Sequence, residues 1–418
     1  MLELDVGPVA AGGSCVAHAE DGRVVFVRHA LPGERVRAVV TAGSVDARYL
    51  RADATEVLRA SADRVSPPCP YAGPGKCGGC DWQHASQAAQ RALKGDVVRE
   101  QLRRLAGVQQ PVEVEEVPGA PDGLGWRTRV AFSVRPDGVV GLRRHRSHEV
   151  QPVDRCLIAH EAVTAVGVER RRWPETSTVQ VIAAVGTGDR AVVVTPADPS
   201  AEPAAPPLDA PAALLRGDGD GRVTAVRGRA GVRERAAGRG WRVSGSGFWQ
   251  VHPGAADALV AAVLAALVPE PGETALDLYA GVGLFAGALA PRLAPGGGVV
   301  AVEADATAAA DAAYNLRDLP SVQVRAATVR AALRGLRRAV DLVVLDPPRS
   351  GAGPALCRQL AGLRPRAMAY VACDPAALAR DVGALAGAGY RLADLRAFDL
   401  FPMTSHVECV ALLVPEHR

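Results

Sequence analysis

From about residue 240 to residue 418, short apolar segments alternate with alanine-rich segments, and this alternation constrains the fold more than any other feature. The apolar segments have the length of buried strands, and the segments between them have the composition of helices. Such an alternation predicts a parallel sheet covered by helices. The predicted strands span residues 275–278, 299–302, 322–326, 342–345 and 367–371. We therefore predict an α/β domain with a Rossmann-like fold over residues 236–418.

A glycine-rich loop follows the first of these strands. It contains Tyr279, Gly281 and Gly283, and glycines let a backbone turn tightly and approach a ligand. Glu303 ends the next strand, where an acid can bind the hydroxyls of a ribose. The third glycine of the dinucleotide fingerprint is missing, and Asp277, four residues before Gly281, fits S-adenosylmethionine better than NAD. The alternative is an ordinary tight turn.

Two other strands of this domain are followed by side chains that can bind or react with a substrate. Asp346 follows strand 342–345, and Cys373 follows strand 367–371. Because ligands of open α/β sheets bind beyond the carboxyl ends of the strands, we expect Asp346 and Cys373 in one crevice. Asp346 can accept hydrogen bonds from the edge of a base, and Cys373 is a candidate nucleophile. The alternative for Cys373 is a buried core cysteine.

Glu408 lies among apolar residues at the start of a predicted last strand. Partial burial raises the pKa of a carboxyl group toward the range of a useful general base. The alternative is a surface glutamate paired with an arginine. A thiolate, a carboxylate base and a methyl donor are what methylation of carbon 5 of uracil requires. Attack of the thiolate on carbon 6 makes carbon 5 nucleophilic, and the base later removes the proton from carbon 5.

Three cysteines, Cys69, Cys77 and Cys80, share one glycine-rich loop, and Cys156 is the natural fourth member of the group. Four thiolates suit an iron–sulfur cluster or a structural zinc ion, and spacing alone does not distinguish the two. The chain shows no signal peptide and no apolar run of roughly 18–20 residues that would span a bilayer. We therefore expect a cytoplasmic protein without a membrane partner, in which cysteines stay reduced.

The first 57 residues have the pattern of a small β domain. Glycine-containing turns separate short segments of β-forming residues, and a count near five strands favours a small closed barrel of the oligonucleotide-binding type. Any other small β domain is the alternative. The predicted strands span residues 6–9, 24–28, 36–41 and 49–57.

Residues 58–235 are predicted to form a central α+β domain that carries the cysteine group. A helix is expected near residues 86–105, and residues 197–212, rich in proline and alanine, are expected to form a flexible spacer. The predicted strands of this domain include residues 129–134, 178–184 and 191–195.

Taken in order, these segments resemble the RNA 5-methyluridine methyltransferases that carry an N-terminal TRAM barrel and a [4Fe-4S] cluster. The resemblance rests on the barrel, the cysteine group, the glycine loop, the Asp-Pro-Pro segment, Cys-x-Pro-Ala-x-Leu-Ala-Arg-Asp and the final His-x-Glu. It implies a class I methyltransferase domain, a TRAM-like barrel at residues 1–57, and methyl transfer from S-adenosylmethionine to a uridine of RNA. Ribosomal 23S RNA is favoured as the substrate, and tRNA is the other candidate.

The resemblance also implies roles for individual residues. Cys373 would be the nucleophile and Glu408 the base. The cofactor would contact Gln250, Tyr279, Gly281, Gly283, Glu303 and Asp346, and the [4Fe-4S] cluster would be bound by Cys69, Cys77, Cys80 and Cys156. No obligate protein partner is evident. Three residues depart from the family pattern: Asp374 and His252 each replace an asparagine, and Leu284 stands where an asparagine is common.

The net charge of +3 neither requires nor excludes a nucleic-acid partner, and only two of the 48 basic residues are lysines, which is typical of a compositional bias. Arg127, Arg129, Arg143, Arg144 and Arg146 are dense enough to form a phosphate-binding face, and a solvated arginine-rich surface is the equal alternative. Two other functions stay open. One is methylation of a different substrate, and the other is a catalytically silent RNA-binding or assembly protein.

Overall fold

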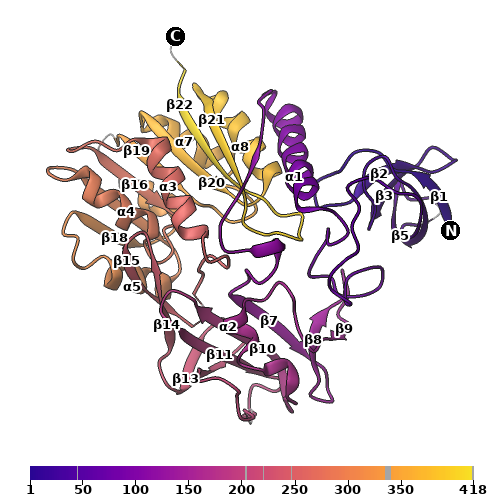
Figure 1. Cartoon of the computed structure of the whole chain (residues 1–418). Helices are drawn as coiled ribbons and strands as arrows, with labels where there is room; N and C mark the ends of the chain where they lie inside the picture. Colours follow the sequence, from indigo (N-terminus) through magenta and orange to yellow (C-terminus); the bar gives the residue numbers. More distant parts are fainter. Residues whose placement is uncertain (45, 203–204, 220, 246, 335–339, 417–418) are drawn as a thin grey trace.

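The computed structural model describes residues 1–44, 46–202, 205–219, 221–245, 247–334 and 340–416. Figure 1 shows three parts: a small β-barrel at one side, a β-rich central part, and a larger α/β part built mainly from the C-terminal half. Helix α1 (Gln87–Gln101) stands between the barrel and the α/β part. The described residues contain no helix that is both long and apolar enough to span a membrane.

The α/β part is an eight-stranded sheet with the order β18-β17-β16-β19-β20-β22-β21-β6. The first five strands in this order are parallel, as predicted. Beyond these five strands the sheet is mixed, because β22 runs antiparallel to both β20 and β21. A short loop joins β21 to β22, so this pair needs no crossover helix. The strands are β16 (Thr274–Leu278), β17 (Gly298–Glu303), β18 (Val322–Ala326), β19 (Leu342–Leu345), β20 (Ala367–Ala372), β21 (Tyr390–Asp399), β22 (Glu408–Pro415) and β6 (Val114–Glu116).

Helices cover both faces of this sheet. One core contains side chains of α3, α4 and α5, and the other contains side chains of α6, α7, α8 and the end of α1. Thus α1, although far away in the sequence, helps to bury a face of the catalytic sheet. The helices are α3 (Ala255–Leu267), α4 (Leu284–Leu293), α5 (Ala306–Asn315), α6 (Val329–Arg334), α7 (Pro354–Gly362) and α8 (Pro375–Ala386).

The N-terminal part is a five-stranded sheet with the order β1-β4-β5-β3-β2. Backbone hydrogen bonds from Gly7 N to Val16 O and from Val16 N to Pro8 O link its two ends, so the sheet closes on itself. The predicted strand at residues 6–9 is wrong: the strand lies earlier, at Leu2–Asp5. The other strands are β2 (Cys15–His18), β3 (Val24–Arg28), β4 (Arg35–Ala42) and β5 (Tyr49–Arg59). The barrel core continues into Trp82 and the buried side of α1.

The central part is a seven-stranded sheet with the order β13-β12-β11-β10-β7-β8-β9, beside a hairpin formed by β14 and β15. The helix α2 (Glu161–Thr164) packs against it. The described residues of the predicted spacer at 197–212 contain no helix or strand. The strands are β7 (Arg129–Val134), β8 (Val140–Arg143), β9 (Val150–Pro152), β10 (Thr176–Ala184), β11 (Asp189–Pro196), β12 (Ala213–Gly217), β13 (Val223–Arg227), β14 (Gly231–Ala236) and β15 (Arg239–Ser244).

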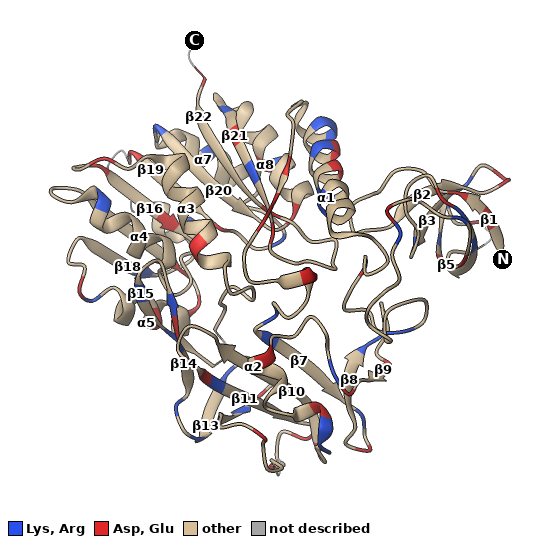
Figure 2. Cartoon of the chain, in the orientation of Figure 1, with Lys and Arg blue, Asp and Glu red and all other residues tan. Residues whose placement is uncertain are grey.

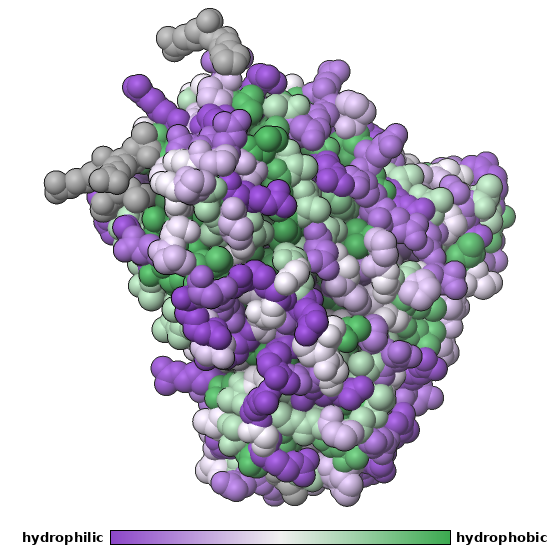
Figure 3. Space-filling model, turned by 60° about the vertical axis from the view of Figure 1, so that its left-hand side comes forward, coloured by the Kyte–Doolittle hydropathy of each residue, from purple (hydrophilic) through white to green (hydrophobic). Residues whose placement is uncertain are grey.

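Charged residues are distributed over all three parts, and basic and acidic residues alternate along the outer side of α1 (Figure 2). On the side brought forward in Figure 3, hydrophobic residues lie scattered among hydrophilic ones. The visible surface therefore offers no broad apolar face on that side.

Candidate active site

The carboxyl edge of the eight-stranded sheet gathers most of the predicted site residues. Along this edge, Glu303 ends β17, Tyr279 follows β16, Asp346 follows β19 and Cys373 follows β20. The strand β22 runs in the opposite direction, so its first residue, Glu408, arrives at the same edge. The antiparallel hairpin thus supplies a carboxylate that a wholly parallel sheet would not place there.

Register places Glu408 next to Cys373. Ala372, the last residue of β20, pairs with Cys409 of β22, so the residues that come just after and just before this pair are neighbours. Glu408 is 4% exposed, while Cys373 is half-buried and accessible to a substrate. The alternative interpretation of Glu408 as a surface glutamate is therefore wrong.

Burial controls the acid–base properties of this group. Burial raises the pKa of Cys373 to about 11, and the nearby carboxylates of Glu408 and Asp346 contribute to the rise. Burial also raises the pKa of Glu408 well above its usual value, and the charge of Asp346 adds to this effect. Arg349 acts in the opposite direction on both groups. A carboxylate of raised pKa is a stronger base, which suits proton removal from carbon.

Arg349 is a site residue that the sequence interpretation missed. Its Nη2 lies 3.5 Å from Nε2 of His406, two residues before Glu408. The signal was present in the sequence, because Arg349 directly follows the Asp-Pro-Pro segment at the end of a strand. Its positive charge near a cysteine and two carboxyl groups can hold an anionic group in the crevice.

The other half of the edge is built around the glycine loop. Gly281 N donates a hydrogen bond of 2.8 Å to Oε2 of Glu303, so the loop and the acid are held together. Gly283 has a φ of +93°, and a Cβ there would lie 2.6 Å from the side chain of Leu316. A glycine is therefore required where the loop meets the core.

Asp277 lies beneath this loop and supports it. It is 1% exposed, and its Oδ2 accepts a hydrogen bond of 2.8 Å from Ala286 N, while Oδ1 has no partner among the described residues. Burial raises its pKa to about 7. A buried acid with a free oxygen, beside a glycine loop and the acid Glu303 at a strand end, fits a cofactor such as S-adenosylmethionine, which would be held by Tyr279, Gly281, Glu303 and Asp346.

Gln250 comes from a separate segment, between β15 and α3. Its side chain is 9% exposed, and no hydrogen bond joins it to the described residues of the sheet edge. Nearby, His252 accepts a hydrogen bond of 3.1 Å from Gly254 N and stacks on Trp126, with 6.2 Å between the ring centroids. The contact of Gln250 with the cofactor therefore remains a prediction.

The remaining two departures from the family pattern have structural explanations. Asp374 caps the N-terminus of α8, because its side chain accepts a hydrogen bond of 2.7 Å from Ala377 N. Aspartate and asparagine are equally good at this task. Leu284 begins α4 and is buried in the core on one face of the sheet. Neither residue disturbs the crevice.

The four clustered cysteines line one cavity of about 590 Å³ between the cysteine loop and the central sheet. The pKa of Cys80 is raised mainly by burial, and the nearby thiols of Cys156, Cys77 and Cys69 add to the rise. A hydrogen bond of 2.6 Å from Tyr71 Oη to Asp154 joins the two chain segments. In the part of the chain that the structure describes, no three His, Cys, Asp or Glu side chains converge on one point as ligands of a single metal ion do.

The predicted RNA-binding arginines separate into two groups. Arg127, Arg143, Arg144 and Arg146 line the cysteine cavity, and the last three are exposed. The inclusion of Arg129 is wrong: it is 7% exposed, lies 3.6 Å from Glu234 and donates a hydrogen bond to Gly247 O. Its position on β7 points it into the protein, which the local density of arginines could not reveal.

Comparison with known proteins assigns this architecture. Residues 246–416 match the tRNA (uracil-5-)-methyltransferase family, and residues 1–55 match the TRAM domain. The 23S rRNA (uracil(1939)-C(5))-methyltransferase RlmD of Chromohalobacter salexigens is 34% identical, over 98% of this chain and 88% of the relative. The chain belongs to the RNA uracil-5-methyltransferase family. It is an S-adenosylmethionine-dependent enzyme that acts on RNA.

Two further proteins are similar to this chain over nearly its whole length. An uncharacterized RNA methyltransferase of Streptomyces coelicolor is 54% identical, over 99% of this chain and 92% of the relative. The tRNA (uracil-54, C5)-methyltransferase of Pyrococcus abyssi, solved in complex with S-adenosyl-L-homocysteine, has a TM-score of 0.70 at 23% identity and covers 98% of this chain and 100% of its own. The predicted TRAM barrel and class I methyltransferase domain are thus confirmed.

Proposed function

We propose that the enzyme methylates carbon 5 of a uridine through a covalent adduct between Cys373 and carbon 6. The observation that carries this proposal is the register of β20 and β22, which brings a half-buried thiol and a buried carboxyl group to one crevice. Cysteine is the nucleophile, and Glu408 is the general base. This arrangement disfavours a catalytically silent RNA-binding protein, because a pure binder needs neither group.

The proposed reaction conserves atoms and charge. The thiol of Cys373 loses its proton to solvent, its sulfur adds to carbon 6, and the electron pair of the ring double bond becomes available at carbon 5. Carbon 5 takes the methyl group, which S-adenosylmethionine supplies when it is bound. Glu408 then removes the proton from carbon 5, the bond between sulfur and carbon 6 breaks, and the double bond is restored. Asp346 accepts hydrogen bonds from the edge of the uracil ring. Arg349 balances the negative charge that develops nearby.

For the substrate we favour 23S ribosomal RNA, with tRNA as the second candidate. The support is the 34% identity to a 23S rRNA methyltransferase over nearly the whole chain, whereas the tRNA enzyme of known structure is 23% identical. The arginines beside the cysteine cavity would hold phosphates, because Arg143, Arg144 and Arg146 are exposed together there.

The test is a map of 5-methyluridine in total RNA, by mass spectrometry, in cells with and without this gene. We expect the modification to disappear from one uridine in 23S ribosomal RNA. Purified enzyme with an unmodified 23S transcript is expected to restore it. Loss at a tRNA site would reassign the substrate, and no methylation of either transcript by the purified enzyme would contradict the proposal.

We further propose that Cys69, Cys77, Cys80 and Cys156 bind a [4Fe-4S] cluster. They line one cavity, which supports a common ligand. Four thiolates suit an iron–sulfur cluster or a zinc ion, and the resemblance to the TRAM-carrying methyltransferases favours the cluster. Methyl transfer moves no electrons, so the cluster would organise the loop and its neighbouring arginines.

Enzyme purified without oxygen is expected to be brown, with a broad absorption band in the visible blue and bound iron and sulfide. Cys80→Ser is expected to lose the band, because it removes one ligand. Cys357→Ala, which changes a cysteine buried in α7, is the matched control and is expected to keep it. Colourless protein with stoichiometric zinc would contradict the assignment.

A further inference from the structure

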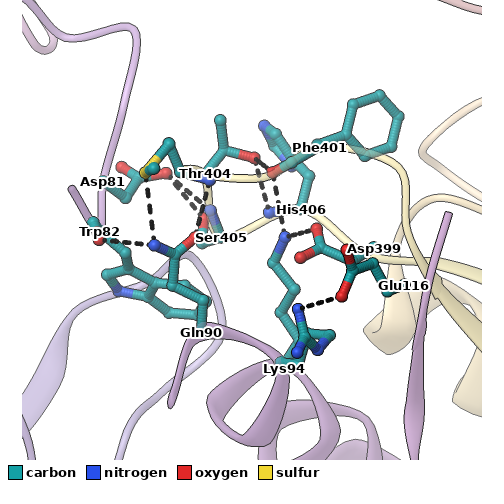
Figure 4. Close-up of polar contacts among 12 residues, drawn as sticks. Asp81, Trp82, Gln90, Lys94, Glu116, Asp399, Phe401, Thr404, Ser405 and His406 are labelled. Atoms are coloured by element: carbon teal, nitrogen blue, oxygen red, sulfur yellow. Dashed lines mark hydrogen bonds and ion pairs between the residues drawn. The ribbon is translucent and has the colours of Figure 1, made fainter. Parts of the chain in front are cut away.

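The loop that leads into Glu408 is held by the cysteine loop. Asp81, the residue after Cys80, accepts two hydrogen bonds of 3.0 Å at Oδ2, one from Ser405 N and one from Ser405 Oγ. Figure 4 shows Asp81 and Ser405 facing each other across these contacts. Ser405 lies three residues before Glu408, so a shift of Ser405 is transmitted along very little chain.

A second contact between the same two loops involves the backbone of Met403. Its carbonyl oxygen accepts hydrogen bonds from Asp81 N and Trp82 N, at 2.9 and 3.0 Å. Met403 has a φ of +67°, a conformation that side-chain-bearing residues adopt only under constraint. Such strain persists where the surroundings determine it, and it is concentrated at functional sites. The cysteine loop therefore fixes an otherwise unfavourable bend just before Glu408.

The barrel meets the other two loops at the same place. Trp82 Nε1 donates a hydrogen bond of 2.9 Å to Gly13 O, and Arg28 of β3 lies 3.8 Å from Oδ1 of Asp81. A Cβ on Gly13 would lie 2.6 Å from Cβ of Ser405. All three parts of the molecule thus touch within a few residues, which we call the junction: Gly13, Asp81, Trp82, Met403 and Ser405.

The rest of the loop is held by α1, which also contacts the junction at Met403. Lys94, which is completely buried, contacts Asp399 Oδ1 at 2.5 Å and donates to Phe401 O at 3.0 Å. Gln90 Oε1 accepts a hydrogen bond of 2.7 Å from Met403 N. These contacts fix the beginning of the loop, so the segment nearest the base depends on Asp81 (Figure 4).

We propose that Asp81 is a positioning residue for the general base: through Ser405 and Met403 it holds the segment before Glu408 in register with Cys373. This inference rests on the proposed role of Glu408. The cysteine loop and the barrel then affect catalysis, because both position the side chain of Glu408 although neither contacts it. A base displaced by about 1 Å would slow proton removal on the order of 10²-fold, while leaving the earlier attack by Cys373 intact.

The distinguishing signature is an accumulated adduct. Asp81→Ala is expected to lower kcat by roughly 10- to 100-fold, to change the KM for S-adenosylmethionine little, and to leave a covalent enzyme–RNA complex visible on a denaturing gel. Ser405→Ala is expected to act in the same direction but more weakly, because the backbone hydrogen bond remains. Asp81→Asn keeps one acceptor oxygen and is expected to recover most of the rate. The probes are unmodified 23S and tRNA transcripts with S-adenosylmethionine.

Asp63→Ala, which changes an exposed aspartate outside the junction, is the matched control and is expected to behave as the parent enzyme. Visible absorbance and thermal melting report whether the Asp81 variants keep their fold. If Asp81→Ala loses its visible absorbance or its thermal stability, Ser405→Ala tests the proposal instead, because Ser405 is distant in sequence from the cysteine loop. If Glu408→Gln accumulates adduct but the Asp81 and Ser405 variants do not, the junction proposal is wrong and the mechanism stands. If Glu408→Gln itself accumulates none, both are wrong.

Discussion

Cys373→Ala is expected to abolish methylation, with a loss on the order of 10⁴-fold or more, because the neighbouring thiol in the described part of the chain, Cys409, is completely buried and cannot replace it. The change removes a single sulfur from a half-buried position, so little loss of stability is expected. The measurement is transfer of radiolabelled methyl from S-adenosylmethionine to an unmodified 23S transcript, with binding of the cofactor measured in parallel.

The control separates loss of chemistry from loss of structure. Cys357→Ala removes another buried sulfur and is expected to retain methylation. Cofactor affinity of the Cys373 variant is expected to match that of the parent enzyme, because the glycine loop and Glu303 lie at other strands of the edge. Methyl transfer by Cys373→Ala at more than a few per cent of the parent rate would rule out the covalent route.

Glu408→Gln is expected to trap the enzyme on its RNA. The thiolate still adds and the methyl group still transfers, but removal of the proton from carbon 5 slows by about 10²- to 10⁴-fold. A denaturing gel is expected to show a slowly migrating complex that requires both RNA and S-adenosylmethionine. The double variant with Cys373→Ala is expected to show no complex, which identifies the sulfur as the point of attachment.

The same variant tests the electrostatics of the crevice. Because the carboxylate of Glu408 contributes to the raised pKa of Cys373, removing its charge is expected to lower that pKa below about 11. The rate of alkylation of Cys373 by iodoacetamide, followed by peptide mass spectrometry, is expected to rise at a lower pH than in the parent enzyme. An unchanged or higher midpoint would show that Glu408 does not lie close to the thiol.

Much of the catalytic sheet could be predicted because its strands are buried on both faces and are therefore continuous apolar runs. The predicted segment 342–345 coincides with β19, which is buried throughout. The predicted segment 322–326 coincides with the edge strand β18, which is only partly buried. The antiparallel arrangement of β21 and β22 was not predicted, because pairing direction depends on tertiary context. Likewise, β6 has three residues and no periodicity of its own.

For the site, the sequence pattern located Asp346 and Cys373 by their place at strand ends, and β19 and β20 bring both to one edge. Glu408 was singled out by its apolar neighbours instead, and it begins β22. Contacts between distant loops left no such signal. Nothing in the spacing of Asp81 and Ser405 shows that they are bonded, since they are far apart in the chain. Arg129 illustrates the opposite limit: a run of arginines was visible, but which of them is buried depends on the pleat of β7.

The edge strand β6 has a consequence for how the protein is made. It pairs with β21, which is translated only after the whole central domain and most of the α/β part. In a nascent chain, β6 and the inner side of α1 therefore lack their partners until β21 has been synthesised. Contacts between segments so distant in sequence form late. The barrel and the central part leave the ribosome first, and the proposed base arrives with β22, the strand inserted between β20 and β21. Chains interrupted before that strand carry the barrel but lack the proposed base.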